Sequence, residues 1–356
     1  MNDGWLTLDV IVFAIGWSLG WLLLWHPRPL PKAPAAPPLG LPNVAIVIPA
    51  RNEASSLPHL LAPLVPQVAP GDELVVVDDH SDDDTAATAQ RAGAVVAPAP
   101  DVPSGWLGKP NACWHGACGT TAPVLVFLDA DVRPAPDLID RLRFAVHEHP
   151  DAVISVQPWH ETERPGEQAS VLCNVTALMG SGAFAVIGGR HRPVAYGPVI
   201  AISRHTYERV GGHAAAEVRT MHTEDIGLAL AVGQTQLYTG RPNTRFRMYP
   251  GGLGDTIRGW TRSIATGARH GSWWAALATL AWVWSLAGGW LVSPWVYPLS
   301  AAQFWILGRR AASVHPVTAL LYPVAVLVFA LTVVRSALVL TLGRSVDWKG
   351  RTVRSR

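Results

Sequence analysis

The hydrophobic residues of the chain fall into short runs in its centre and long stretches near both ends. The short runs lie within residues 43–53, 72–85 and 124–134, and each finishes in polar or acidic residues. Segments with helical spacing follow these runs. Continuous apolar strands that alternate with helices are typical of a parallel sheet covered on both faces. We therefore predict an α/β domain with a mostly parallel sheet over residues 43–271.

The long apolar stretches predict helices that cross a membrane. Residues 5–25 contain one charged residue, Asp9, and residues 272–308 contain none. Because about 20 apolar residues span a bilayer core as a helix, we predict a transmembrane anchor in residues 1–26 and further membrane segments in residues 272–343. The first stretch lacks a basic start and a small-residue cleavage site, which favours a retained anchor over a signal peptide.

Two segments of distinct composition flank these regions. Residues 27–42 are rich in proline, so we expect a stiff, extended linker. Residues 344–356 form a basic tail. Arg28 and Lys32 follow the first apolar stretch, and no Lys or Arg precedes it. The positive-inside rule therefore predicts that the soluble domain lies in the cytoplasm. The apolar stretches near both ends predict a multi-pass protein of the cell (inner or plasma) membrane.

The number of C-terminal crossings stays open at this level. Three crossings after a cytoplasmic domain would leave the basic tail outside, whereas two would keep it inside. Two crossings require part of residues 272–308 or 315–343 to be re-entrant or interfacial, and we favour this arrangement with a cytoplasmic tail. Arg335, the one charged residue of 311–343, is either a functional residue or an arginine that snorkels or pairs helices.

Composition agrees with a membrane protein. Of the 356 residues 49% are hydrophobic and 15% are charged, with a mean hydropathy of +0.21, whereas soluble domains carry roughly 25% charged residues. The net charge of +2 and the lack of a long basic run give no indication of a nucleic-acid partner. Cys113, Cys118 and Cys173 fit neither a zinc pattern nor a disulfide framework, which is typical of a reducing compartment.

Acidic residues follow the predicted strands. Glu53, Asp78, Asp79, Asp129 and Asp131 all fall where an apolar run ends. In open α/β sheets, ligands bind outside the carboxyl ends of the strands. Asp129 and Asp131 together can hold a divalent cation that bridges a diphosphate, although such a pair at a strand end also occurs as a solvated turn.

Further candidates have plain structural alternatives. Lys109, in the segment PSGWLGKPNAC, can clamp a phosphate or can be a surface lysine. Glu224 and Asp225, in MHTEDIGLAL, can be functional acids or an ordinary helix N-terminus, where acids favour the dipole. Gln157, at the end of SVQPW, faces the site or merely ends a strand.

The segment IRGWTRSIATGARHG (257–271) also has two interpretations. Its Arg258, Trp260 and Arg262 lie just before the membrane stretch. They belong either to the functional site or to an interfacial belt of Trp and Arg. A position beside the membrane would bring such side chains to the interface in both cases.

Five motifs stand in a recognisable order: Pro-x-Arg-Asn-Glu, Val-Asp-Asp-x-Ser-x-Asp, Gly-Trp-x-Gly-Lys-x-x-Ala, Leu-Asp-Ala-Asp and Thr-Glu-Asp. With them the chain resembles a membrane-anchored family 2 glycosyltransferase of the Rossmann-like GT-A fold. Within that family it is most similar to the 4,4'-diaponeurosporenoate and hopanoid-associated group, which it also resembles in MYPGG, GWTRSIATGA and the tail VDWKGR.

The resemblance implies a role for each matching position. On the donor side, the nucleoside would be held by Pro49, Ala50, Arg51 and Glu53. Asp79 would contact uracil or ribose, and Lys109 would lie near the diphosphate. Arg258 and Arg262 are donor-side positions that match the family only loosely. Acceptor-side positions would be Trp260 and Gln157.

The resemblance also implies a metal and a base. Asp129 and Asp131 match the Asp-x-Asp motif that contacts donor and Mn²⁺ or Mg²⁺, and we expect Asp131 to hold the metal and Asp129 to lie nearer the ribose or sugar. Asp225 matches the catalytic base, with Glu224 beside it. The Gln-x-x-Arg-Trp motif of processive members is missing from the sequence, which speaks against a polysaccharide synthase.

The function so implied is an inverting, metal-dependent transfer of a hexose, glucose from UDP-glucose, to a membrane-embedded carotenoid or other isoprenoid. A carboxylic acid acceptor is already ionised at neutral pH and needs no base. The presence of Asp225 therefore slightly favours an acceptor that reacts through a hydroxyl group. Two alternatives stay open. One is a polyprenyl-phosphate or sterol-like acceptor, and the other is a non-catalytic membrane module that binds nucleotides.

Overall fold

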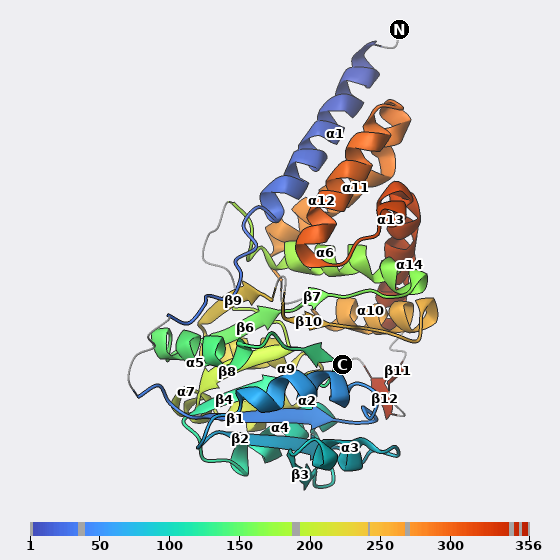
Figure 1. Cartoon of the computed structure of the whole chain (residues 1–356). Helices are drawn as coiled ribbons and strands as arrows, with labels where there is room; N and C mark the ends of the chain where they lie inside the picture. The colour runs from blue at the N-terminus through green and yellow to red at the C-terminus, as the bar shows by residue number, and fades with distance from the viewer. Residues whose placement is uncertain are drawn as a thin grey trace. The chain divides into compact units, whose positions relative to one another are not determined.

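The computed structural model describes residues 3–34, 40–186, 193–240, 243–267, 271–341, 345–348 and 351–354 (Figure 1). The chain divides into two compact units. The first, here called the sheet unit, comprises Arg28–Trp159 and Pro193–Arg247. The second, the helical unit, comprises Met1–Pro27, His160–Arg192 and Met248–Arg356.

A seven-stranded sheet forms the centre of the sheet unit, with the strand order β3-β2-β1-β4-β8-β6-β9. The strands β1 to β4 are mutually parallel, and β8 runs antiparallel to both of its neighbours before β9 pairs parallel with β6. The strand bounds are β1 Val44–Ala50, β2 Glu73–Asp78, β3 Val95–Pro98, β4 Val124–Leu128, β6 Val153–Gln157, β8 Val199–Ser203 and β9 Thr235–Thr239.

Short strands beside the main sheet complete the unit. Arg245 and Phe246 of β10 pair antiparallel with Arg133 and Val132 of β5. The bounds are β5 Val132–Arg133, β7 Trp159–His160 and β10 Arg245–Phe246. The chain passes from the sheet unit to the helical unit within β7.

Helices cover both faces of the main sheet, because its strands alternate apolar side chains between the faces. Val44, Ile46 and Ile48 of β1 face one core, together with α2, α3 and α5. Ala45 and Val47 face the other, together with α4, α7, α8 and α9. The helix bounds are α2 Leu57–Leu64, η1 Val65–Gln67, α3 Thr85–Arg91, α4 Gly108–Cys118, α5 Leu138–Glu148, α7 Arg204–Arg209, η3 Gly212–Ala214, α8 Ala216–Arg219 and α9 Glu224–Val232.

The predicted α/β architecture is confirmed, including the mostly parallel sheet. β1, β2 and β4 each occupy the apolar run from which a strand was expected. The antiparallel β8 was not predicted, because its short apolar run VIAIS does not reveal the direction in which the strand pairs. The helix expected after β1 is α2, and it is followed by the short 3₁₀ turn η1.

The helical unit is built around helices that pack in pairs. Within it α1 packs along α11, α6 contacts α11, α12 and α14, and α10 packs against α14 (Figure 1). The bounds are α1 Asp3–Leu23, η2 Pro165–Ala169, α6 Ser170–Ser181, α10 Leu253–Gly267, α11 Trp273–Val292, α12 Val296–Ala311, α13 Pro316–Leu320, α14 Tyr322–Thr341, β11 Ser345–Trp348 and β12 Arg351–Arg354.

A buried amide ties three of these helices together. Gln303 of α12 accepts a hydrogen bond from Trp282 Nε1 of α11 at 3.0 Å and donates one to the carbonyl of Trp17 in α1 at 2.6 Å. Trp282 is fully buried and Gln303 is 1% exposed. A satisfied polar group inside an apolar bundle fixes one packing arrangement, because any other leaves the amide without partners.

Among the residues that the structure describes, one helix segment is long and apolar enough to cross a bilayer, Tyr322–Val339 within α14. In α1, Asp9–Leu23 is a shorter apolar stretch. The transmembrane anchor expected in residues 1–26, the number of crossings in 272–343 and the side of the tail stay predictions. Arg335 is exposed in α14, which agrees with either interpretation of this residue.

Gly116 makes one of the close approaches in the sheet unit that only glycine permits. Gly116 lies in α4 where that helix crosses β1 and β2, and a Cβ there would sit 2.4 Å from Val47 Cγ1 and 2.9 Å from Val77 Cγ2. Real Cβ atoms do not approach side chains so closely. The spacing between α4 and the sheet, and therefore the position of residues on α4, depends on this glycine.

Gly116→Ala should lower the thermal unfolding midpoint by several degrees, because overpacking a tight core costs about 1–3 kcal/mol. Alanine otherwise stabilises a helix by up to about 1 kcal/mol relative to glycine. Gly180→Ala is the matched control, since nothing lies within 4 Å of a Cβ at that position in α6. Circular dichroism melts would measure both variants. An unchanged midpoint for Gly116→Ala would show that α4 is free to move off the sheet.

Candidate functional site

The carboxyl ends of β1 and β2 are joined by hydrogen bonds between their loops. Arg51 donates from Nη1 to the carbonyl of Asp79 at 2.8 Å. The amide of Asn52 donates to Ser81 Oγ at 3.0 Å, and the amide of Glu53 donates to Thr85 Oγ1 at 2.8 Å. The structure thus brings together Arg51, Glu53 and Asp79, the three polar positions expected to hold the nucleoside.

Asn52 makes this junction possible. Its φ of 53° lies in the left-handed region, which asparagine tolerates better than most residues. Its side-chain carbonyl accepts a hydrogen bond from the amide of Asp82 at 2.8 Å. The Arg-Asn-Glu sequence after β1 therefore joins the two loops and also supplies candidate ligands.

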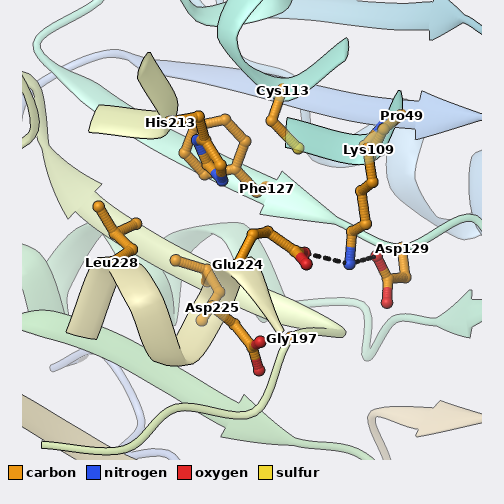
Figure 2. A pocket seen from close by; sticks show the side chains of 11 residues that line it. Pro49, Lys109, Cys113, Phe127, Asp129, Gly197, His213, Glu224, Asp225 and Leu228 are labelled. Atoms are coloured by element: carbon orange, nitrogen blue, oxygen red, sulfur yellow. Dashed lines mark ion pairs between the residues drawn. The ribbon is translucent and has the colours of Figure 1, made fainter. Parts of the chain in front are cut away.

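An ion cluster lies beside this junction, where three separate elements meet. The ammonium of Lys109, the second residue of α4, contacts Asp129 Oδ1 at 2.7 Å and Glu224 Oε1 at 2.6 Å (Figure 2). Asp129 follows β4, and Glu224 is the first residue of α9. One lysine therefore holds two carboxylates that would otherwise repel each other.

The two carboxylates control the charge of Lys109. Burial alone would lower the pKa of this lysine, but the charges of Asp129 and Glu224 outweigh burial and raise the pKa well above its ordinary value. Glu224 is 5% exposed. Lys109 therefore stays protonated.

Asp225, the residue after Glu224, has a different environment. Burial raises the pKa of its carboxyl to about 7, and the neighbouring Glu224 adds to the increase, while Lys109 opposes it. In Figure 2 its carboxylate points toward Gly197. A carboxyl that titrates near neutral pH is suited to accept a proton from a substrate.

These residues border a small pocket on the side of the sheet covered by α4 and α9 (Figure 2). Five of its lining residues were predicted from sequence: Pro49, Lys109, Asp129, Glu224 and Asp225. Six were not: Cys113, Phe127, Gly197, Ile200, His213 and Leu228. The turns YGPV before β8 and GGH before α8 were the available signals for Gly197 and His213.

His213 lines the pocket together with Phe127 and also contacts Tyr207. Its Nδ1 lies 2.9 Å from Tyr207 Oη, and its ring lies 4.8 Å from that of Phe127. Burial lowers the pKa of His213 to about 3, helped by the charge of Lys109. The imidazole is therefore neutral at physiological pH and leaves Lys109 as the cation of this pocket.

The remaining predicted residues lie outside the lining of this pocket. Ala50 ends β1 and is buried, Asp131 follows Asp129 by two residues, and Gln157 ends β6 at 9% exposure. The amide of Gly240 donates to the Gln157 carbonyl at 2.8 Å. The sheet unit holds all three, and their contacts with substrate stay predictions.

The GWTR residues belong to the helical unit. Trp260 is 5% exposed and donates from Nε1 to Ser170 Oγ at 2.5 Å, which joins α10 to α6. Arg258 forms an ion pair with Asp255 three residues before it. These contacts give Trp260 and Arg258 structural roles. The functional roles expected for Trp260, Arg258 and Arg262 stay predictions.

The donor set at Asp129 and Asp131 fits a hard divalent cation. Within the described ranges no three His, Cys, Asp or Glu side chains converge as a complete metal cage. Mg²⁺-like ions are commonly held by one or two carboxylates together with substrate phosphates. A carboxylate has two oxygens, so the contact of Asp129 with Lys109 does not use up its capacity as a ligand.

Comparison with known proteins agrees with this arrangement. Residues 45–175 match the family model of glycosyl transferase family 2. Residues 45–175 form a family 2 glycosyltransferase domain. The matched region of this glycosyltransferase domain contains Lys109, Asp129 and Asp131. The predicted resemblance to family 2 is thereby confirmed, and the membrane anchor stays a prediction.

A curated relative supports the same family. The 4,4'-diaponeurosporenoate glycosyltransferase of Staphylococcus aureus (strain USA300) is 33% identical over 238 residues, which are 63% of this chain and 61% of the relative. The match therefore spans about three fifths of that relative's length.

A solved structure resembles the fold over nearly the whole chain. The mannosyltransferase PcManGT from Pyrobaculum calidifontis, solved in complex with GDP-Man and Mn²⁺, covers 94% of this chain and 98% of its own, with 17% identity and a TM-score of 0.56. At this identity the likeness shows the fold alone. The α/β GT-A-like fold of the glycosyltransferase domain is confirmed.

Asp225→Asn should make the protein more stable above pH 7. The pKa of the Asp225 carboxyl is about 7 in the folded chain against an ordinary value of 3.8, so between these pH values the folded state binds the extra proton and stability falls as pH rises. Asparagine carries no such charge. We expect a gain of about 1 kcal/mol or more at about pH 8 that shrinks toward about pH 5.

Thermal unfolding midpoints of both proteins at the two pH values would measure this gain. Asp151→Asn is the matched control, because Asp151 is exposed and forms a surface ion pair with Arg209 at 3.6 Å. A gain of the same size at both pH values would contradict a raised pKa at Asp225.

Proposed function

We propose that this protein transfers a hexose from a nucleoside diphosphate sugar to a lipid acceptor in the membrane, with inversion at the anomeric carbon. The observation that carries the proposal is the pairing of Asp225, whose pKa is raised to about 7, with the Lys109–Asp129–Glu224 cluster beside it. A proton acceptor adjacent to a charged diphosphate site is what a single displacement requires.

Asp225 is proposed as the base. With a pKa of about 7, a substantial fraction of this carboxylate is ionised at neutral pH and yet basic enough to take a proton from an alcohol in the transition state. Glu224 contributes by raising that pKa and by holding Lys109. A hydroxyl acceptor gains from such a base, whereas an ionised carboxylate acceptor has no proton to lose.

The donor is proposed to bind along the carboxyl edge of β1, β2 and β4. Arg51, Glu53 and Asp79 would contact the nucleoside, with Pro49 and Ala50 as the adjoining backbone. Lys109 would face the diphosphate. UDP-glucose is the donor that we propose.

Asp129 and Asp131 would hold a divalent cation, Mn²⁺ or Mg²⁺, which when bound supplies positive charge beside the leaving diphosphate. The acceptor oxygen bonds to the anomeric carbon while the bond from that carbon to the diphosphate oxygen breaks. The acceptor's proton passes to Asp225, and the nucleoside diphosphate leaves with the electron pair.

The lipid acceptor and membrane location rest on the helical unit and on the named relative. Large apolar side chains are exposed along its helices, among them Trp284 at 69%, Leu327 at 59% and Val334 at 57%. Exposed apolar area on this scale marks a surface that meets lipid or protein. The relative from Staphylococcus aureus is named for 4,4'-diaponeurosporenoate, and we propose a carotenoid or other isoprenoid acceptor here.

Asp225→Asn should abolish transfer while the protein still binds the nucleotide. Loss of general-base catalysis lowers rates by about 10²–10⁴-fold, and the donor contacts are proposed to lie elsewhere. Mass spectrometry of lipid extracts from cells with the wild type, Asp225→Asn or no protein would reveal the hexose mass difference. Nucleotide binding to purified protein would be measured in parallel.

The control for this experiment is Asp151→Asn, the same chemical change at an exposed position of the sheet unit. It should support wild-type transfer. Normal product formation by Asp225→Asn would refute the proposed base, and nucleotide binding without any sugar transfer by the wild type would favour a non-catalytic module.

A further inference from the structure

Gly197 borders the two groups on which the proposed reaction depends. A Cβ at this position would lie 3.2 Å from Asp225 Oδ2, 3.3 Å from Asp225 Cγ and 3.5 Å from Lys109 Nζ. Figure 2 shows Gly197 beside the Asp225 carboxylate, at the edge of the pocket. No other glycine among the described residues lines this pocket.

The backbone conformation at Gly197 does not demand glycine. The glycines in the left-handed region, with φ between 51° and 94°, include Gly211 and Gly212 but not Gly197. Gly116 and Gly212 face apolar or aromatic core groups, Val47 and Tyr207, and serve packing. Gly197 instead faces a carboxylate and an ammonium, so its missing side chain preserves space at polar, reactive atoms.

The chain around Gly197 is clamped on both sides. Ser155 Oγ of β6 donates to the carbonyl of Tyr196 at 3.1 Å and accepts from the amide of Tyr196 at 2.6 Å. The carbonyl of Pro198 accepts from the amide of Asp129 at 2.9 Å. A substituent at Gly197 therefore cannot be relieved by a simple shift of the loop.

The missing side chain of Gly197 leaves room for an acceptor oxygen to pack against its Cα, beside Asp225 and Lys109. A general base acts on a donor oxygen at about 2.6–3.2 Å, and the Cβ position of Gly197 is 3.2 Å from Asp225 Oδ2. An oxygen in van der Waals contact with Gly197 Cα on this side would lie within reach of the base and close to Lys109, the proposed diphosphate ligand.

We propose that Gly197 is a positioning residue that keeps room for the nucleophilic oxygen of the acceptor between Asp225 and Lys109. This inference rests on the proposed function. In this proposal the YGPV turn shapes the acceptor site, whereas the donor binds at the ends of β1 and β2. A methyl group at this position would displace the acceptor oxygen from its contact with Cα and would leave the donor's place open.

The test compares Gly197→Ala with the wild type in the full-length protein, using UDP-glucose, Mn²⁺ and a lipid extract as acceptor. We expect the kcat/KM for lipid transfer to fall by about 10²-fold, the loss typical of a misplaced reactant. The affinity for UDP-glucose should stay within about twofold, and slow hydrolysis of UDP-glucose by water should persist, since water is smaller than a lipid hydroxyl.

Gly180→Ala is the control, since no atom lies within 4 Å of its Cβ, and it should behave as wild type in every assay. The ratio of transfer to hydrolysis is the decisive readout, because a general loss of structure lowers both together. Retained UDP-glucose affinity shows that Gly197→Ala is folded.

Wild-type transfer by Gly197→Ala would overturn the inference and leave the proposed function intact. Equal losses of transfer and hydrolysis, or loss of UDP-glucose binding, would also overturn it, because Gly197 would then shape the donor side or the fold. A wild-type protein that turns over no nucleotide sugar would overturn the proposed function, and the inference with it.

Discussion

The contact of one ammonium with two carboxylates organises the site of this glycosyltransferase domain. Lys109 lies 2.7 Å from Asp129 and 2.6 Å from Glu224, and these residues come from α4, the end of β4 and the start of α9. Removal of the lysine would leave two acids facing each other, which is costly where solvent is partly excluded. Asp225 follows Glu224 in the chain, and burial together with the charge of Glu224 raises its pKa, while Lys109 opposes the increase.

The site also shows a conflict between stability and function. Burial and Glu224 make the ionised form of Asp225 unfavourable in the folded protein, and a neutral side chain would be better tolerated. Perturbed carboxyls of this kind gather at functional sites because catalysis needs a pKa near the working pH. The clamps around Gly197 and the close approach of α4 at Gly116 supply the rigidity that keeps such an arrangement in place.

Much of this could be predicted from the sequence, and the limits have physical causes. The apolar runs of β1, β2 and β4 end in Asp or Arg-Asn-Glu and predict three strands. The acids at the ends of these strands could therefore be identified from the sequence. Gly197 and His213 were not, because they reach the pocket through the antiparallel pairing of β8 and a buried contact with Tyr207, which leave no periodic pattern. Trp260 was expected near the acceptor, and its hydrogen bond to Ser170 is a contact between distant segments that no local signal reveals.

The most direct test of the account is the pH dependence of kcat/KM for sugar transfer to a lipid alcohol in the wild type and in Glu224→Gln. For the wild type, activity should rise with pH through an apparent pKa of about 7, the value for Asp225. In Glu224→Gln this limb should move to lower pH, since the neighbouring negative charge that helps to raise the pKa is gone. A limb at the same pH in both proteins, or none near neutral pH, would contradict the role given to Asp225 and its neighbour.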